Sequence, residues 1–199
     1  MKIDSVWRPA LAATVLLFAA SAAAAEPFDD VTGYGTLGFG DTQAREVSLD
    51  DVTGRLGARF GSYFGVEGEG SIGLNRENFL YGPSCARFAI CPLFIGLGKI
   101  RLSDAEAAYA VGFLPIAPNA DLFARVGYGT SHFDMQPSFL GSSRQGVNFG
   151  AGAQYFFDGI NGVRFDYTRT EFNTSGIFGR NALGSGANVF SLAYTLKFG

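Results

Sequence analysis

The chain has 199 residues, of which 47% are hydrophobic and 17% are charged, with 15 basic and 18 acidic side chains and a formal net charge of -3. Because this balance is mildly acidic, it gives a nucleic-acid partner no electrostatic support. The 28 glycines and 20 phenylalanines are typical of strand surfaces on which backbones crowd together. Two cysteines and one histidine are too few for a protein metal site, and we expect no cofactor.

The first 25 residues have the features of a secretory signal peptide. Basic residues precede the apolar run Ala10–Ala20, and Ala23 and Ala25 form a small-x-small cleavage pattern. A retained transmembrane helix needs about 20 strongly apolar residues, whereas this run is short and rich in alanine. We therefore expect residues 1–25 to be removed and residues 26–199 to form one domain.

Eight segments alternate between apolar and polar side chains with the two-residue period of a strand that has one apolar and one polar face. Clusters of Gly, Pro, Asn and Asp bound them, as is typical of turns. In chain order, we predict strands at Val31–Gly40, Val52–Ser62, Phe64–Gly73, Asp104–Leu114, Asp121–Thr130, Gly146–Phe157, Val163–Phe172 and Phe190–Phe198. An even number of strands is typical of a closed up-and-down bacterial barrel.

The connections between these strands alternate in length. Short links lie near 62–63, at 115–120 and at 158–162, and long ones lie at about 41–51, 74–103, 131–145 and 173–187. In outer-membrane barrels, short turns face the periplasm and long loops face outward. The sequence therefore predicts an all-β fold, namely an eight-stranded antiparallel up-and-down transmembrane β-barrel with four long outer loops. Within the loop at 74–103, Leu93–Leu102 is either a strand extension above the membrane or a short helix.

The polar face of these strands carries a balanced set of charges. It holds four basic and four acidic side chains, which are Arg55, Arg59, Arg125, Arg164, Glu67, Glu69, Glu106 and Asp166. A basic side chain that faces lipid at mid-membrane costs about 2 to 4 kcal/mol, so we expect the charged face to line the lumen. Because eight strands leave an interior that side chains can fill, we predict a plugged, ion-paired lumen and not a wide pore.

Two cysteines lie close together in the longest predicted loop. In an exported protein, an isolated pair such as Cys85 and Cys91 is typical of a disulfide that restricts a loop, and we predict that bond. Two free thiols are the alternative. A bridged loop presents Arg87, Phe88 and Ile90 at its tip, either as a contact surface or merely as a protease-resistant turn.

Segments rich in glycine and aromatic residues recur at 61–68, 122–129, 150–156 and 163–167, and the chain ends in a strand with aromatics on its apolar face. In these segments the chain resembles the small outer-membrane barrels of the OmpA and OmpX type. That group of porin-like surface proteins also includes opacity-type adhesins. The resemblance implies the barrel fold and an outer-membrane location, and it indicates little about activity.

The same resemblance extends to the signal that the barrel-assembly machinery reads in the last strand of such proteins. The signal maps onto Ser191, Ala193, Leu196 and Phe198. Two features differ from the family pattern, because Ala193 stands in place of Gly and Gly199 follows the phenylalanine that normally ends the chain.

Aromatic residues in the predicted outer loops, such as Phe88 and Phe139, either bind a partner or form the outer girdle of the barrel. We expect the protein to have no enzymatic activity. Barrels that resemble lipid A deacylases pair a histidine with a serine two residues on, but the residue two positions after His132 is Asp134.

The leading hypothesis is an outer-membrane barrel with a structural or adhesive role. Its expected partners are outer-membrane lipid, lipopolysaccharide and an extracellular ligand or host surface. The alternatives are a small channel, a lipid-modifying enzyme and a soluble barrel of the lipocalin type.

Overall fold

The computed structural model describes residues 31–44, 47–81, 96–136, 142–173 and 186–198. They form nine antiparallel strands: β1 (Val31–Ala44), β2 (Val47–Phe60), β3 (Phe64–Gly73), β4 (Glu77–Tyr81), β5 (Gly96–Ala117), β6 (Ala120–Gln136), β7 (Ser142–Phe156), β8 (Asn161–Phe172) and β9 (Gly186–Phe198). In this part of the chain, no helix is long and apolar enough to cross a membrane. The predicted signal peptide at 1–25 and the predicted pair Cys85 and Cys91 lie outside the described residues.

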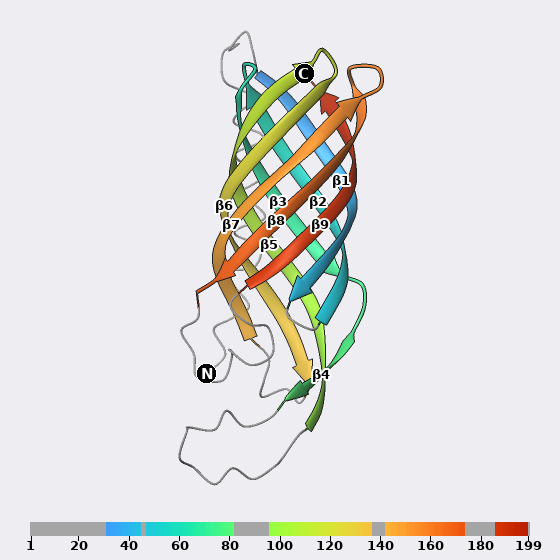
Figure 1. The fold of residues 1–199 in the computed structure, drawn as a ribbon, viewed down its shortest axis with the longest axis vertical. Helices are drawn as coiled ribbons and strands as arrows, with labels where there is room; N and C mark the ends of the chain where they lie inside the picture. Colours follow the sequence, from blue (N-terminus) through green and yellow to red (C-terminus); the bar gives the residue numbers. More distant parts are fainter. Residues whose placement is uncertain (1–30, 45–46, 82–95, 137–141, 174–185, 199) are drawn as a thin grey trace.

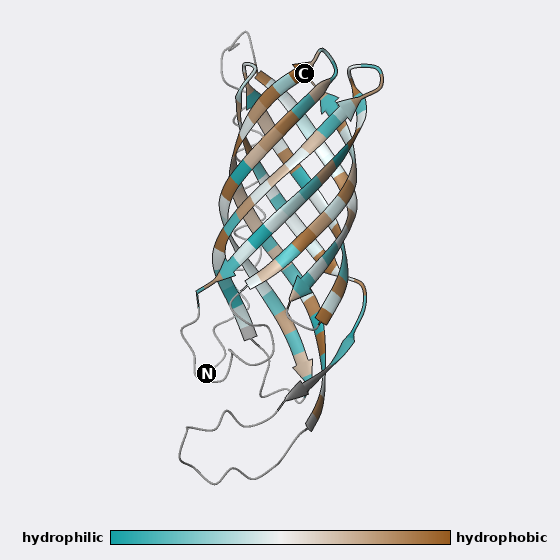
Figure 2. Cartoon of the chain, viewed as in Figure 1, coloured by the Kyte–Doolittle hydropathy of each residue, from teal (hydrophilic) through white to brown (hydrophobic). Residues whose placement is uncertain are grey.

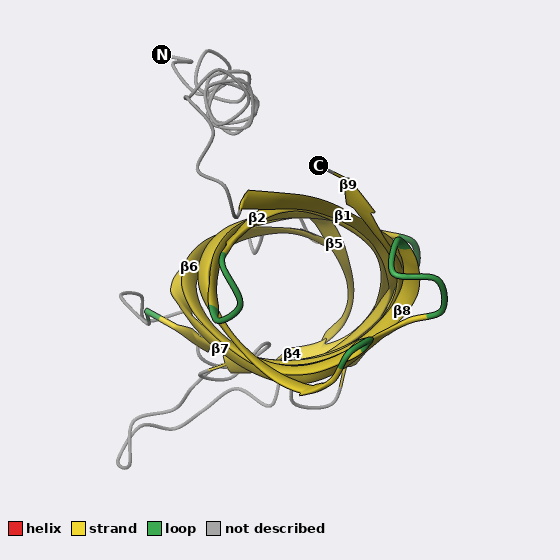
Figure 3. Ribbon diagram, turned by 90° about the horizontal axis from the view of Figure 1, so that it is seen from above, coloured by secondary structure: helices red, strands yellow, loops and turns green. Residues whose placement is uncertain are grey.

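Eight of the nine strands close into a barrel (Figures 1 and 3). Each strand pairs with its neighbour in the order β3-β2-β1-β9-β8-β7-β6-β5, and β3 also pairs with β5, which completes the ring. β4 is additional, because it pairs with the start of β5, from Glu77 opposite Ile100 to Tyr81 opposite Gly96. The eight-stranded antiparallel barrel that the sequence predicted is therefore confirmed.

The first and last barrel strands pair along most of their length. Their register runs from Gly33 opposite Phe198 to Gln43 opposite Asn188. The alternating C-terminal strand thus joins the two ends of the chain, as the sequence indicated. A closed barrel leaves no unpaired strand edge at this position.

Side chains alternate between the two faces of the barrel wall, and Figure 2 shows this alternation along the strands. Large apolar residues such as Leu37, Phe39, Phe64, Ile72 and Leu192 are exposed on the outer face. Polar and charged residues of the intervening positions are buried in the lumen. An apolar outer band with a polar interior is the arrangement that lipid requires.

Short turns join the strands at one end of the barrel, drawn at the top of Figure 1. Two of them contain a glycine at positive φ, Gly61 at 61° and Gly159 at 82°, where a residue without a Cβ is favoured. In the second turn, the Asp158 carboxylate accepts hydrogen bonds from the backbone N–H groups of Ile160 (3.0 Å) and Asn161 (2.6 Å). These bonds hold the pKa of Asp158 below its ordinary value.

At the opposite end, the strands extend farther than the sequence predicted. The loop expected at 41–51 is mostly strand, because β1 and β2 stay paired as far as Ala44 opposite Val47. Alternation persists there, with Thr42 and Leu49 buried and Gln43 exposed. The segment at 93–102, which the sequence left open between strand and helix, belongs to β5 from Gly96 onward.

Candidate functional site

Six of the predicted lumen charges meet inside the barrel. They are Arg55 from β2, Glu67 and Glu69 from β3, Arg125 from β6, and Arg164 and Asp166 from β8. Three are basic and three are acidic, so the cluster is electrically balanced. We call these six residues the lumen charge cluster.

Two arginines of the cluster each bridge several carboxylates. Arg125 Nη1 donates to Glu67 Oε1 (2.8 Å) and Glu69 Oε2 (2.9 Å), and its Nη2 donates to Asp166 Oδ1 (2.7 Å). Arg55 donates from Nε to Glu69 Oε2 (2.6 Å) and from Nη2 to Asp166 Oδ1 (3.2 Å). Since shared carboxylates link β2, β3, β6 and β8, the cluster joins opposite parts of the barrel wall.

Aromatic side chains surround the cluster. The Tyr34 hydroxyl donates to Glu67 Oε2 and the Tyr109 hydroxyl to Glu69 Oε1, each at 3.1 Å. The Arg125 guanidinium lies 4.3 Å from the centre of the Tyr109 ring. Such contacts stabilise the buried charges and fill the space around them.

A second, smaller group lies toward the short turns. Arg59, another predicted lumen residue, donates from Nη1 to Asp121 Oδ2 (2.9 Å), and Gln154 Nε2 donates to the same oxygen (2.9 Å). Asp121 was not among the predicted lumen residues, because it stands at the boundary of a predicted strand. Asp121 and Arg125 are both at odd-numbered positions of β6, so the alternation of that strand already indicated that Asp121 points into the lumen.

Glu106 is the one predicted lumen charge that the structure places elsewhere, and that prediction is wrong. Glu106 is exposed, whereas Tyr109, Val111 and Phe113 of the same strand point inward and are buried. Alanines occupy both faces here, so the polarity pattern identified the wrong face. A register shift between Leu102 and Asp104 also changes the phase along β5.

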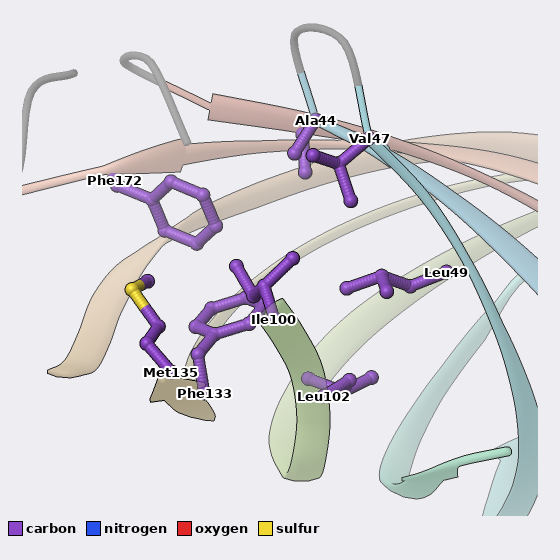
Figure 4. Close-up of a cluster of buried hydrophobic side chains, with 9 residues drawn as sticks. Ala44, Val47, Leu49, Ile100, Leu102, Phe133, Met135 and Phe172 are labelled. Atoms are coloured by element: carbon purple, nitrogen blue, oxygen red, sulfur yellow. The ribbon is translucent and has the colours of Figure 1, made fainter. Parts of the chain in front are cut away.

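An apolar cluster fills the other end of the lumen, away from the short turns (Figure 4). Its buried members are Ala44, Val47, Leu49, Ile100, Leu102, Phe133, Met135, Phe172 and Ala187. We call it the outer apolar cluster. The Phe133 and Phe172 rings contact edge to face, with their centres 6.3 Å apart. This end of the interior is therefore packed like a protein core.

The single histidine lies on the outer part of β6. His132 Nδ1 and Asp104 Oδ2 are 2.8 Å apart, and both side chains are about one-third exposed. Within the described ranges, no group of three or more His, Cys, Asp or Glu residues is arranged to hold a metal ion.

The four residues of the predicted assembly signal lie on both faces of β9. Ser191 and Ala193 are buried in the lumen, where Ser191 Oγ accepts a hydrogen bond from Arg55 Nη2 (3.0 Å). Leu196 and Phe198 are exposed on the outer face. Their use as a signal stays a prediction.

The chain is similar in fold to two solved outer-membrane proteins. One is Ail, the attachment invasion locus protein of Yersinia pestis, solved in complex with the heparin analogue sucrose octasulfate. The two chains are 12% identical and align with a TM-score of 0.52, which covers 85% of this chain and 99% of Ail. The other is the N-terminal β-barrel domain of Pseudomonas aeruginosa OprF, at 10% identity and a TM-score of 0.51 over 83% and 97%.

By sequence, none of the curated proteins matches this chain. The family model described as "Outer membrane protein beta-barrel domain" matches residues 10–198. That match covers most of the chain, and it agrees with the closed barrel and its apolar outer face. The chain therefore belongs to the outer membrane protein β-barrel domain family.

Proposed function

We propose that this outer-membrane protein has a structural or surface-interaction role, in which the barrel is a closed anchor and the outer connections make the specific contacts. The observation that carries this proposal is the filling of the lumen. The lumen charge cluster and the outer apolar cluster occupy successive parts of the interior. A barrel of eight strands has room for little else.

The packing of the charges supports an anchor in preference to a pore. The side chains of Arg55, Glu67, Arg125, Arg164 and Asp166 are each at most 1% exposed. Removing one partner from such a network leaves an uncompensated buried charge. The network is therefore expected to stay closed under ordinary conditions.

Outer-membrane lipid and lipopolysaccharide are the proposed partners of the barrel exterior, and an extracellular ligand or host surface is the proposed partner of the outer connections. The segment 82–95 has Arg87 as its only charged residue, so the net acidity of the whole chain does not decide the charge of that ligand.

Conductance measurements test the closed anchor. The purified protein in planar bilayers is expected to show no large steady conductance. A stable channel of nanosiemens size would instead support the small-porin alternative. That alternative has one observation in its favour, a small cavity inside the lumen between the two clusters.

Adhesion measurements test the role of the outer connections. Replacing residues 82–95 by a short Gly-Ser linker is expected to lower the binding of expressing cells to host-cell monolayers. The matched control replaces a short turn at the other end, with Pro118→Asn and Asn119→Gly. Equal binding by both variants and the wild type, at equal surface amounts, would contradict the proposal.

Export and assembly belong to the same proposal. Residues 1–25 are proposed to be a cleaved signal peptide, and Ser191, Ala193, Leu196 and Phe198 to be the signal for the barrel-assembly machinery. Mass spectrometry of the protein from outer membranes is expected to find Glu26 as the first residue. We propose no enzymatic activity, so His132→Ala is expected to leave lipid hydrolysis by purified membranes unchanged.

A further inference from the structure

A buried carboxylate in the lumen lies outside the lumen charge cluster. Asp51 is on the inward face of β2 and is 2% exposed. Its Oδ1 accepts a hydrogen bond from Thr53 Oγ1 (2.6 Å), and its Oδ2 accepts one from Thr42 Oγ1 (3.0 Å). Both donors are neutral, and no lysine or arginine of the described residues forms an ion pair with Asp51.

The neighbouring cluster does not neutralise this carboxylate. Its three arginines are matched by its three acidic residues, and Arg55, the nearest of them along β2, donates to Glu69 and Asp166. Asp51 is therefore a buried carboxylate that no arginine of the cluster compensates. A buried charge requires a partner, because burial without compensation is strongly unfavourable.

The Asp51 side chain lines a cavity of about 50 Å³ between the lumen charge cluster and the outer apolar cluster. Thr42, Thr53, Ser71 and Asn148 line the same space. A cavity of this size holds a few water-sized particles. It is therefore large enough for one small ion that keeps part of its hydration.

Asn148 supplies an independent indication of a bound group. Its side chain is 5% exposed, and its Nδ2 donates to the Tyr109 hydroxyl (3.1 Å). Its carbonyl Oδ1 has no hydrogen-bond partner among the described residues. A buried amide oxygen beside a cavity, with no donor, is a ready ligand for a cation or for a water molecule bound to one.

We propose that this cavity is a binding site for one monovalent alkali cation, Na⁺ or K⁺. The Asp51 carboxylate supplies the charge, and the oxygens of Thr53, Ser71 and Asn148 complete a set of hard ligands. Asp51 brings one negative charge that no ion pair of the described residues compensates, so a single monovalent ion is enough to neutralise it. Arg55 also lines this cavity, and its Nη1 has no hydrogen-bond partner among the described residues.

Thermal stability in different salts tests the site independently of any adhesive role. The full chain is refolded in detergent micelles at one ionic strength in NaCl, KCl or N-methylglucamine chloride, whose cation is too large for the cavity. We expect the wild type to lose its heat-modifiable gel mobility at a temperature several degrees higher in NaCl or KCl. Asp51→Asn is expected to abolish the difference.

Asp50→Asn is the matched control, because Asp50 is exposed and accepts a hydrogen bond from Asn75 Nδ2 (3.0 Å). This variant is expected to keep the full difference between salts. Equal midpoints for the wild type in all three salts, or a difference that survives in Asp51→Asn, would overturn the proposal. So would a larger shift in CaCl₂ than in NaCl at the same ionic strength.

A second measurement does not depend on a folded variant. Crystals of the wild-type protein grown in a rubidium salt are expected to give an anomalous scattering peak beside Asp51. Crystals that diffract well and lack this peak would refute the site.

Discussion

Arg164 and Glu67, which are 97 positions apart in the chain, form a two-pronged ion pair across the barrel interior. Arg164 Nη1 lies 2.7 Å from Glu67 Oε2, and Nη2 lies 3.3 Å from Oε1. Their strands, β8 and β3, are separated by three strands in either direction around the ring. The pair therefore connects diametrically opposite walls, with both side chains fully buried.

Neutralising one member of this pair is expected to destabilise the barrel. Glu67→Gln removes a charge that contacts Arg55, Arg125 and Arg164, which leaves buried cations without full compensation. We expect a loss of about 3 to 5 kcal/mol in the free energy of unfolding, measured by urea titration in lipid vesicles.

The matched control makes the same chemical change on the outer face of β5. Glu106→Gln is expected to change the free energy of unfolding by no more than about 0.5 kcal/mol, since Glu106 is exposed. Similar losses in both variants would show that the position inside the lumen is not what matters.

A glycine on the inward face of β2 makes room for a tyrosine. A Cβ atom at Gly57 would lie 2.3 Å from Cζ and 2.6 Å from the hydroxyl oxygen of Tyr34, which donates to Glu67. Gly57→Ala must displace that ring, and we expect a loss of about 1 to 3 kcal/mol. Gly54→Ala on the outer face meets no atom within 4 Å and is expected to be tolerated. Urea titration of both variants measures the contrast, and equal stabilities would contradict it.

The outer apolar cluster is expected to behave like a protein core. Leu49 is 0% exposed, so Leu49→Ala leaves a cavity and is expected to lower stability by about 2 to 5 kcal/mol. Leu97→Ala, at a position that is 77% exposed, is the control. The temperature at which the folded gel band disappears is expected to fall clearly only for Leu49→Ala. An unchanged temperature for that variant would mean that the cluster does not support the barrel.

The turn that contains Asp158 is expected to make stability depend on pH. Hydrogen bonds from backbone N–H groups lower the pKa of this carboxyl below its ordinary value of 3.8. A lowered folded-state pKa stabilises the protein above the unfolded-state pKa, and the contribution disappears as the pH falls through the folded-state value. The stability difference between the wild type and Asp158→Ala is therefore expected to shrink between about pH 5 and pH 2. Urea midpoints at several pH values measure it, and a constant difference would contradict this explanation.

Much of the fold could be predicted because strand alternation is a local property. In β9, Phe190 to Phe198 alternate without interruption, so the face that meets lipid and its partner β1 followed from the sequence. The outer hairpin of β1 and β2 was not predicted in full. The outward side chains of this hairpin are polar, because they lie beyond the apolar band that contacts lipid. Without apolar residues on one face, the alternation of apolar and polar residues cannot distinguish a strand from a loop.

The inward face of β5 could not be read from the sequence. Ala105, Ala107, Ala108 and Ala110 suit either face, so Glu106 decided which face was predicted to point inward, and that prediction was wrong. The lumen has a fixed volume, and the structure fills it with Tyr109, Val111 and Phe113. Ala108 and Ala110 are then left to face outward.

The sequence by itself determined the strand period, the apolar band and the set of charges that had to avoid lipid, because each depends on the spacing of residues within a single strand. Only the tertiary structure decided that Arg164 meets Glu67 and that Asp51 remains outside the balanced cluster. Those relationships depend on the register and closure of all eight strands. Contacts across the lumen join residues that are far apart in the chain, and no sequence period indicates which of them meet.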